Sequence, residues 1–268
     1  MLLLSTLGPE GRFDNTLSTA LFSDRGAEER LIPELLSTMD EKGYRALEID
    51  FEYVEPEERE AYAAFVSRLT SAMNESGYPV TVALAPKTFR DQPGLLYEAH
   101  DYALLGGAAN RATLMTYEWG YAYGPPMAVA PLDKVRAVVD YALSEIPANK
   151  IFLGIPNYGY DWTLPYTPGR AARSLSPGEA RALALETRSE ILFDGTAQAP
   201  YFYYTDGAGE EHAVWFEDAR SFLAKLRLIA EKGLAGYAVW TVMRRAQTLF
   251  SETNALFELA GDPPPQNA

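Results

Sequence analysis

Strand-like runs alternate with amphipathic helical segments along most of this chain of 268 residues. This alternation predicts a parallel sheet, because the connection between two parallel strands needs a crossover that is usually a helix. The strand-like runs occupy residues 2–7, 48–53, 80–85, 112–117, 151–156 and 235–241. Helices are predicted over residues 27–42, 56–76, 94–105, 131–146, 217–232 and 246–259. We therefore expect an α/β fold with six strand–helix units, whereas a complete (β/α)8 barrel has eight.

One region interrupts the alternation. Residues 160–216 are rich in aromatic and turn-forming residues, with a helix predicted at 177–187 and short strands at 190–193, 201–205 and 212–216. We interpret this region as a small α+β insertion. The predicted organisation is a first barrel part (1–159), the insertion (160–216), a second barrel part (217–260) and a mobile Pro-rich tail (261–268).

Composition excludes several classes of function. The 37 acidic and 23 basic residues leave a formal charge of −14, which argues against nucleic acid and anionic membranes as partners. No run approaches the roughly 20 apolar residues that span a bilayer. The absence of cysteine removes disulfides and thiolate chemistry. The two histidines, His100 and His212, leave little room for a histidine metal site or a Ser-His-Asp triad, so we expect no cofactor.

Acidic residues occupy one face of the second predicted strand. Glu48, Asp50 and Glu52 would point one way, and Ile49, Phe51 and Tyr53 the other, because side chains alternate along a strand. Carboxylates in such a row resist ionising together, so at least one pKa should rise. A carboxylic acid with a raised pKa can donate a proton near neutral pH.

The acidic row has two alternative interpretations. It is also the pattern of a strand with one solvated acidic face. An oxygen-ligand site for Mg²⁺ or Ca²⁺ is disfavoured, because same-face side chains about 7 Å apart are too far for all three to bind one ion.

Acidic and aromatic residues also recur where the predicted strands end, which is where barrels place their catalytic groups. They include Glu52, the segment Tyr117-Glu118-Trp119, residues 157–162 with Tyr160, and Trp240. Aromatic faces stack on pyranose rings, while carboxylates and phenols bind their hydroxyl and amide groups. The pattern therefore favours a sugar site, although Tyr117 and Trp240 taken singly are also typical of core residues.

Three segments together resemble the glycoside hydrolases of family 18, the chitinase and N-acetylglucosaminidase family. Ile49-Asp50-Phe51-Glu52 resembles the family's D-x-x-D-x-D-x-E strand, Met115-Thr116-Tyr117-Glu118-Trp119 its M-x-Y-D segment, and Gly236-Tyr237-Ala238-Val239-Trp240 its last barrel strand. The stretch from Thr116 to Pro131 is similar to a bacterial spore-type branch that trims peptidoglycan fragments at N-acetylglucosamine. The resemblance extends from Leu2 to about Leu249.

The resemblance implies a role for each matching residue. Glu52 matches the general acid/base, Asp50 the residue that orients the substrate's 2-acetamido group, and Tyr117 the phenol that hydrogen-bonds it. In this family the acetamido group attacks the anomeric carbon, an exception to the scheme with two enzyme carboxylates. Trp240 matches the floor of the sugar site. We expect Glu118, Trp119, Tyr160 and Glu48 to contribute to substrate binding.

The chain also departs from the family pattern. Arg45, Ala46 and Glu48 stand where the motif has aspartate, glycine and aspartate, and Glu118 replaces the usual aspartate. The resemblance implies a TIM-type (β/α)8 barrel lacking its first two strand–helix units. We therefore expect a homodimer, marginal stability, or completion of the barrel by a missing N-terminal segment, because an open sheet has exposed edges.

The predicted function is a retaining, substrate-assisted glycosidase acting on β-1,4-linked N-acetylglucosamine in peptidoglycan fragments or chitin-like oligosaccharides. The alternative is a catalytically impaired saccharide-binding protein of the same fold. In either case the partner is a glycan containing N-acetylglucosamine. The resemblance suggests the bacterial spore, the cell wall or the extracellular space as its location.

Overall fold

A computed structural model describes residues 1–244 and 247–257, which form two compact units. The first unit contains residues 1–117, 134–155 and 232–238, and the second contains residues 118–133, 156–231 and the described residues from 239 onward. The predicted mobile tail (261–268) and the end of the predicted helix at 246–259 lie outside the described residues.

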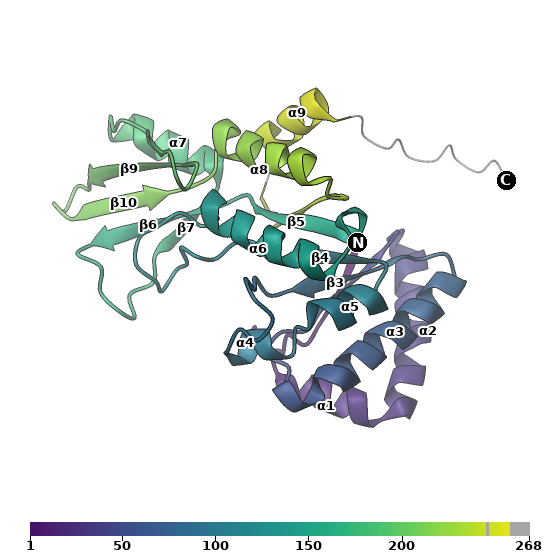
Figure 1. The fold of residues 1–268 in the computed structure, drawn as a ribbon. Helices are drawn as coiled ribbons and strands as arrows, with labels where there is room; N and C mark the ends of the chain where they lie inside the picture. The colour runs from purple at the N-terminus through teal and green to yellow at the C-terminus, as the bar shows by residue number, and fades with distance from the viewer. Residues whose placement is uncertain (245–246, 258–268) are drawn as a thin grey trace. The chain divides into compact units, whose positions relative to one another are not determined.

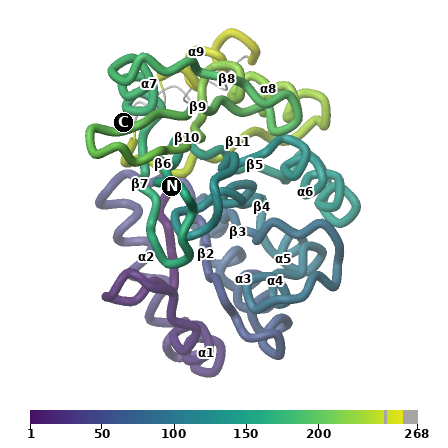
Figure 2. Tube along the Cα trace, turned by 90° about the vertical axis from the view of Figure 1, so that its left-hand side faces the viewer, coloured from purple at the N-terminus to yellow at the C-terminus, as the bar shows by residue number. Residues whose placement is uncertain are grey.

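A six-stranded sheet forms the centre of the first unit, with the strand order β1-β2-β3-β4-β5-β11 (Figure 2). The neighbouring pairs from β1 to β5 are parallel, with Leu4 opposite Ile49 and Ile49 opposite Val82. The partial TIM-type barrel with six strands is thus confirmed. Its strands are β1 (Leu2–Ser5), β2 (Leu47–Asp50), β3 (Val80–Leu84), β4 (Arg111–Leu114), β5 (Ile151–Pro156) and β11 (Gly236–Trp240).

Helices of this unit connect the strands and bury apolar stripes. Helices α2, α3 and α5 pack side by side in chain order (Figure 1). In α3 the buried stripe includes Tyr62, Phe65 and Leu69, spaced as one face of a helix requires. The helices are α1 (Asn15–Ser23), α2 (Arg25–Lys42), α3 (Arg59–Glu75), α4 (Leu95–Glu98), α5 (Tyr102–Ala108) and α6 (Leu132–Glu145), with short 3-10 turns at Pro56–Glu58 and Ala148–Lys150.

Three local predictions were wrong. Helix α1 was not predicted; it begins after Asp14, whose side chain accepts a hydrogen bond from the amide of Thr16. The single helix expected at 94–105 is two helices, because Asp101 caps the start of α5 by accepting from Leu104 N–H. Strand β2 ends at Asp50, and Tyr53 has a φ of 58° and is 40% exposed, so it does not continue the buried face of Ile49 and Phe51.

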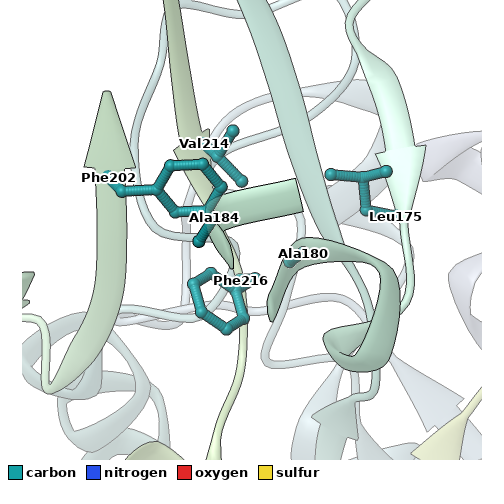
Figure 3. Close-up of a cluster of buried hydrophobic side chains, with 6 residues drawn as sticks. All are labelled: Leu175, Ala180, Ala184, Phe202, Val214 and Phe216. Carbon is teal, nitrogen blue, oxygen red and sulfur yellow. The ribbon is translucent and has the colours of Figure 1, made fainter. Parts of the chain in front are cut away.

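The second unit contains an antiparallel sheet with the order β7-β6-β10-β9-β8. Six side chains form its core, as Figure 3 shows: Leu175, Ala180, Ala184, Phe202, Val214 and Phe216. Strands β6 and β7 were not predicted. The elements are β6 (Gly159–Leu164), β7 (Arg173–Leu175), α7 (Pro177–Glu186), β8 (Leu192–Asp194), β9 (Ala199–Thr205), β10 (Glu211–Trp215), α8 (Ala219–Lys232) and α9 (Gln247–Leu256). None of the described helices combines the length and apolar character needed to cross a membrane.

Candidate active site

The acidic row begins on β2 and ends just beyond it. Glu48 and Asp50 lie on the strand, and Glu52 follows its last residue by two positions. On the opposite face, Ile49 and Phe51 are buried. The Phe51 ring stacks on Tyr62 and Phe65 of α3, with centroid distances of 5.8 and 5.6 Å. This packing fixes the backbone from which the Asp50 and Glu52 side chains project.

Burial raises the pKa values of these acids. The pKa of Asp50 rises to about 7, mainly because the carboxyl is desolvated and secondly because Glu48 is nearby. The pKa of Glu52 also rises to about 7, through its own desolvation and then the charge of Asp50. Burial raises the pKa of Glu48 as well. The predicted direction is confirmed, but burial outweighs the mutual repulsion on which the prediction rested.

The alternative interpretation of the acidic row as a metal site can be compared with the positions of the possible ligand atoms. Only Asp206, Glu210 and His212, at the β9–β10 turn, bring possible ligand atoms within 4.8 Å of one another among the residues that the structure describes. That group has ion pairs that explain it: His212 Nδ1 lies 2.8 Å from Asp161 Oδ1, and Arg170 lies 3.3 Å from Glu210. The acidic row itself has no such arrangement in the described part of the chain.

Tyr117 follows β4, and a neighbouring glycine leaves room for its ring. A Cβ atom added to Gly154 on β5 would lie 2.9 Å from Tyr117 Cε1 and would collide with the carbonyl oxygen of Leu114. The hydroxyl of Thr116 donates a 2.7 Å hydrogen bond to the Gly154 carbonyl, which ties the residue before Tyr117 to β5. The position of Tyr117 therefore depends on a small residue in the adjacent strand.

In the second unit, Glu118 is held by two phenols. The hydroxyls of Tyr158 and Tyr160 donate to Glu118 Oε1 at 2.5 and 3.0 Å. Glu118 has a φ of 65°, a backbone conformation that is rare for a residue with a side chain. Tyr160 and Glu118 were predicted site residues. Tyr158 was missed, although it lies in the aromatic segment 157–162.

Trp240 ends β11 and is 45% exposed, so the interpretation of this residue as core is wrong. Asn157 fixes the backbone around it: Asn157 N–H donates to the Trp240 carbonyl, and Asn157 Oδ1 accepts from Thr241 N–H at 2.7 Å. Trp119 is half-buried, and its backbone N–H donates to the carbonyl oxygen of Val129 at 3.1 Å. An exposed indole such as that of Trp240 is suited to stacking on a sugar ring.

The predicted site residues fall into two groups. Glu48, Asp50, Glu52 and Tyr117 belong to the first unit, and Glu118, Trp119, Tyr160 and Trp240 belong to the second. The first group supplies acids with raised pKa values and a phenol. The second supplies a carboxyl group fixed by phenols and an exposed indole. The acids of the first group are suited to proton transfer, and the indole of the second group is suited to stacking on a sugar ring.

Comparison with known proteins defines the class. Residues 7–244 match the family described as Glycosyl hydrolases family 18, and the chain belongs to this family. Among its relatives is the cortical fragment-lytic enzyme of Bacillus subtilis (strain 168), 45% identical over 241 residues, which are 90% of this chain and 56% of that protein.

Solved structures agree with this assignment. The spore cortex-lytic enzyme SleL of Bacillus megaterium QM B1551 matches with a TM-score of 0.91 and 40% identity, over 96% of this chain and 59% of that one. A chitinase from Chromobacterium violaceum ATCC 12472 matches with a TM-score of 0.85 and 25% identity, over 94% of this chain and 78% of that one. The chain spans about half the length of the cortical fragment-lytic enzymes that it matches.

Proposed function

We propose that this chain is a retaining, substrate-assisted glycosidase that cleaves β-1,4-linked N-acetylglucosamine in peptidoglycan fragments. The observation that carries the proposal is the pair Asp50 and Glu52, whose burial at the end of β2 raises both pKa values to about 7. A general acid works best when its pKa lies near the working pH. Family membership supports a glycosidic bond as the target.

The proposed reaction has two steps. In the first, Glu52 donates its proton to the glycosidic oxygen while the carbonyl oxygen of the 2-acetamido group attacks the anomeric carbon, and the leaving sugar departs as an alcohol. Asp50 orients the acetamido group and offsets the positive charge of the resulting oxazolinium ion. The Tyr117 phenol donates a hydrogen bond to the acetamido oxygen. In the second step Glu52, now a carboxylate, takes a proton from the water that opens the ring.

The remaining residues are proposed to bind the glycan. Trp240 offers an exposed aromatic face to a pyranose, and Glu118, held by Tyr158 and Tyr160, offers a fixed carboxyl group to sugar hydroxyls or amides. Trp119 extends the aromatic surface. Glu48 supports Asp50, whose pKa its charge helps to raise.

The names of the relatives support peptidoglycan as the substrate. Relatives that are 45% and 39% identical are called cortical fragment-lytic enzymes, and two of the matching solved structures are called spore cortex-lytic enzymes. Chitin-like oligosaccharides are the second substrate class, because a solved chitinase matches this chain at 25% identity.

The test is Glu52→Gln, assayed by release of reducing ends from purified muropeptides and from N-acetylglucosamine oligomers. Turnover should be lost while saccharide binding persists, because an amide has nearly the shape of the acid but cannot donate a proton to the glycosidic oxygen as the acid does.

Asp50→Asn and Tyr117→Phe should each lower the rate by about 10²–10⁴-fold. The exposed Glu57, changed to Gln, is the matched control and should retain the wild-type rate. Wild-type rates in Glu52→Gln would contradict the proposal.

A saccharide-binding protein without activity is the second candidate. It is favoured by the altered motif, in which an exposed Arg45 and Ala46 replace aspartate and glycine. Measuring binding by calorimetry and reducing ends on the same muropeptides separates the two. Binding without product would support the second candidate.

A further inference from the structure

His100 is a buried histidine that joins the ends of two strands. The N–H of Ala85 donates to His100 Nδ1 at 2.9 Å, and His100 Nε2 lies 3.1 Å from the carbonyl oxygen of Phe51. A neutral imidazole carries one proton. Since Nδ1 accepts a hydrogen bond, that proton is on Nε2 and is donated to Phe51, the residue immediately before Glu52.

The two groups that His100 joins are those of the next rung of the β2–β3 ladder. The ladder pairs Leu47 with Val80 and Ile49 with Val82, and Leu47 N–H donates to Pro79 O. Continuing this register by two residues would place Ala85 N–H against Phe51 O, because parallel ladders bond every second residue. The imidazole lies between that donor and that acceptor, so the strands separate where Glu52 emerges and both backbone groups remain satisfied.

The surroundings of His100 keep the ring neutral. Complete burial lowers its pKa to about 4; the hydrogen bond to Phe51 O opposes this shift, and the nearby Lys87 ammonium adds to it. Lys87 Nζ donates to the carbonyl oxygen of His100 at 3.2 Å, and the Tyr62 ring packs against the imidazole at a centroid distance of 6.2 Å. An uncharged ring can donate from Nε2 and accept at Nδ1 at the same time.

A second side chain fixes the other end of the bridge. The hydroxyl of Tyr102 donates to Ala85 O at 2.6 Å and accepts from Lys87 N–H at 3.1 Å. Both polar groups of Ala85 are therefore bonded to side chains at the start of α5 or just before it. The end of β3 that binds the His100 ring is therefore held in place. Through its hydrogen bond to Phe51 O, the ring can restrain the backbone next to Glu52.

We infer that His100 is a positioning residue for Glu52: its neutral ring replaces one rung between β2 and β3 and sets the place from which the acid reaches the glycosidic oxygen. The inference rests on the proposed function, since it assigns His100 a part in that reaction. His100 does not touch the substrate. Its loss should therefore lower kcat and leave KM nearly unchanged.

Two substitutions of His100 distinguish its hydrogen-bonding role from a role in packing alone. His100→Gln keeps one acceptor and one donor, because a carboxamide holds oxygen and nitrogen side by side as the ring holds its two nitrogens. His100→Leu fills the space without either. We expect kcat on muropeptides to fall by about 10²-fold in His100→Leu, the loss typical of a slightly misplaced catalytic group, and to recover largely in His100→Gln. His212→Gln, in the second unit, is the control and should behave as wild type.

Equal kcat values for His100→Leu and wild type, with both folded by circular dichroism, would overturn the inference. So would an unchanged kcat with a raised KM, which indicates a binding role. If His100→Leu does not fold, His100→Ala can replace it, because alanine also lacks a donor and an acceptor. Equal kcat values for His100→Gln and His100→Ala would then overturn the inference as well.

A second measurement is independent of activity. Nitrogen NMR of the imidazoles, assigned by comparison with His212→Gln, should show His100 neutral and protonated at Nε2 across the working pH range. A ring protonated at Nδ1, or one that titrates near neutral pH, would contradict the bridge. If the wild-type protein cleaves no glycan but shows this Nε2–H signal, the proposed function fails while the bridge stands, and His100 then has no catalytic step to support.

Discussion

At the scale of single residues, the acids Asp50 and Glu52 lower the stability of the fold at neutral pH. Asp50 and Glu52 have ordinary pKa values of 3.8 and 4.5 and values of about 7 in the folded chain. Between these limits the folded state binds more protons than the unfolded state, so the free energy of unfolding falls as pH rises. The resulting loss of stability is absent below the ordinary pKa values of 3.8 and 4.5, grows as the pH rises, and is complete once the pH has passed about 7.

Glu52→Gln should therefore be more stable than wild type at pH 8 and about equally stable at pH 4. One pKa unit corresponds to about 1.4 kcal/mol, so the raised pKa of Glu52 sets an upper limit of about 3 kcal/mol on the gain. His100, whose pKa is lowered to about 4, has the opposite pH dependence, but both proteins contain it and its effect cancels. Urea unfolding at the two pH values measures the difference.

The exposed Glu57→Gln serves as the control for the loss of a surface carboxyl group. A Glu52→Gln protein that gains nothing between pH 4 and pH 8 would show that the Glu52 pKa is ordinary. The general-acid assignment would then lose its physical basis.

Residue-level prediction from sequence succeeded where a short pattern was enough. Alternation alone identified Glu48, Asp50 and Glu52 as one row and predicted raised pKa values. It could not give the main cause, because desolvation depends on how segments that are distant in the sequence pack around the acids once the chain is folded. His100 was visible only as one of two histidines, since its bridge joins residues separated by 49 and 15 positions.

At the scale of elements, β4 and β5 together determine where Tyr117 lies. Gly154→Ala would place a methyl group against the Leu114 carbonyl and the Tyr117 ring, so the strands or the phenol must move. Overpacking of this kind costs about 1–3 kcal/mol. We expect a lower melting temperature and a reduced kcat, measured by calorimetry and by the reducing-end assay.

Gly107→Ala in α5 is the matched control. Nothing lies within 4 Å of a Cβ at that position, and alanine favours a helix over glycine by about 1 kcal/mol, so stability should rise slightly with activity unchanged. A Gly154→Ala protein with wild-type stability and rate would show that Tyr117 does not depend on this contact.

Strands and long helices with regular periodicity were predicted well, and irregular segments were not. Strand β5 was predicted with its exact ends, and helix α2 ends at Lys42, the predicted last residue. Helix α1 was missed because its start depends on a cap at Asp14 rather than on an apolar stripe. Strand β6 was missed because its aromatic residues had been assigned to a sugar site, and antiparallel partners from β7 and β10 define it as a strand.

At the scale of the whole molecule, β1 is an open edge. Within the part of the chain that the structure describes, β1 is the end strand of its sheet and pairs with β2. Leu3 is 43% exposed, and Leu7 just beyond the strand is 51% exposed. Edge strands with exposed apolar side chains are templates for pairing with another chain. We therefore predict concentration-dependent self-association through β1.

The direction of the Leu3 backbone makes this prediction testable by one substitution. Leu2 N–H donates to Ala46 O, so the alternate residue Leu3 directs its N–H away from β2 and toward the open edge. Leu3→Pro removes that donor without removing a β1–β2 hydrogen bond, whereas Leu3→Val retains it. Light scattering should show dimers in wild type and Leu3→Val and fewer in Leu3→Pro. Because the net charge of −14 repels copies at low ionic strength, the wild-type dimer fraction should rise with salt. Neither substitution alters the net charge, so a loss of dimers in Leu3→Pro alone is attributable to the open edge of β1. A wild-type protein that stays monomeric at high salt and high concentration would contradict the prediction.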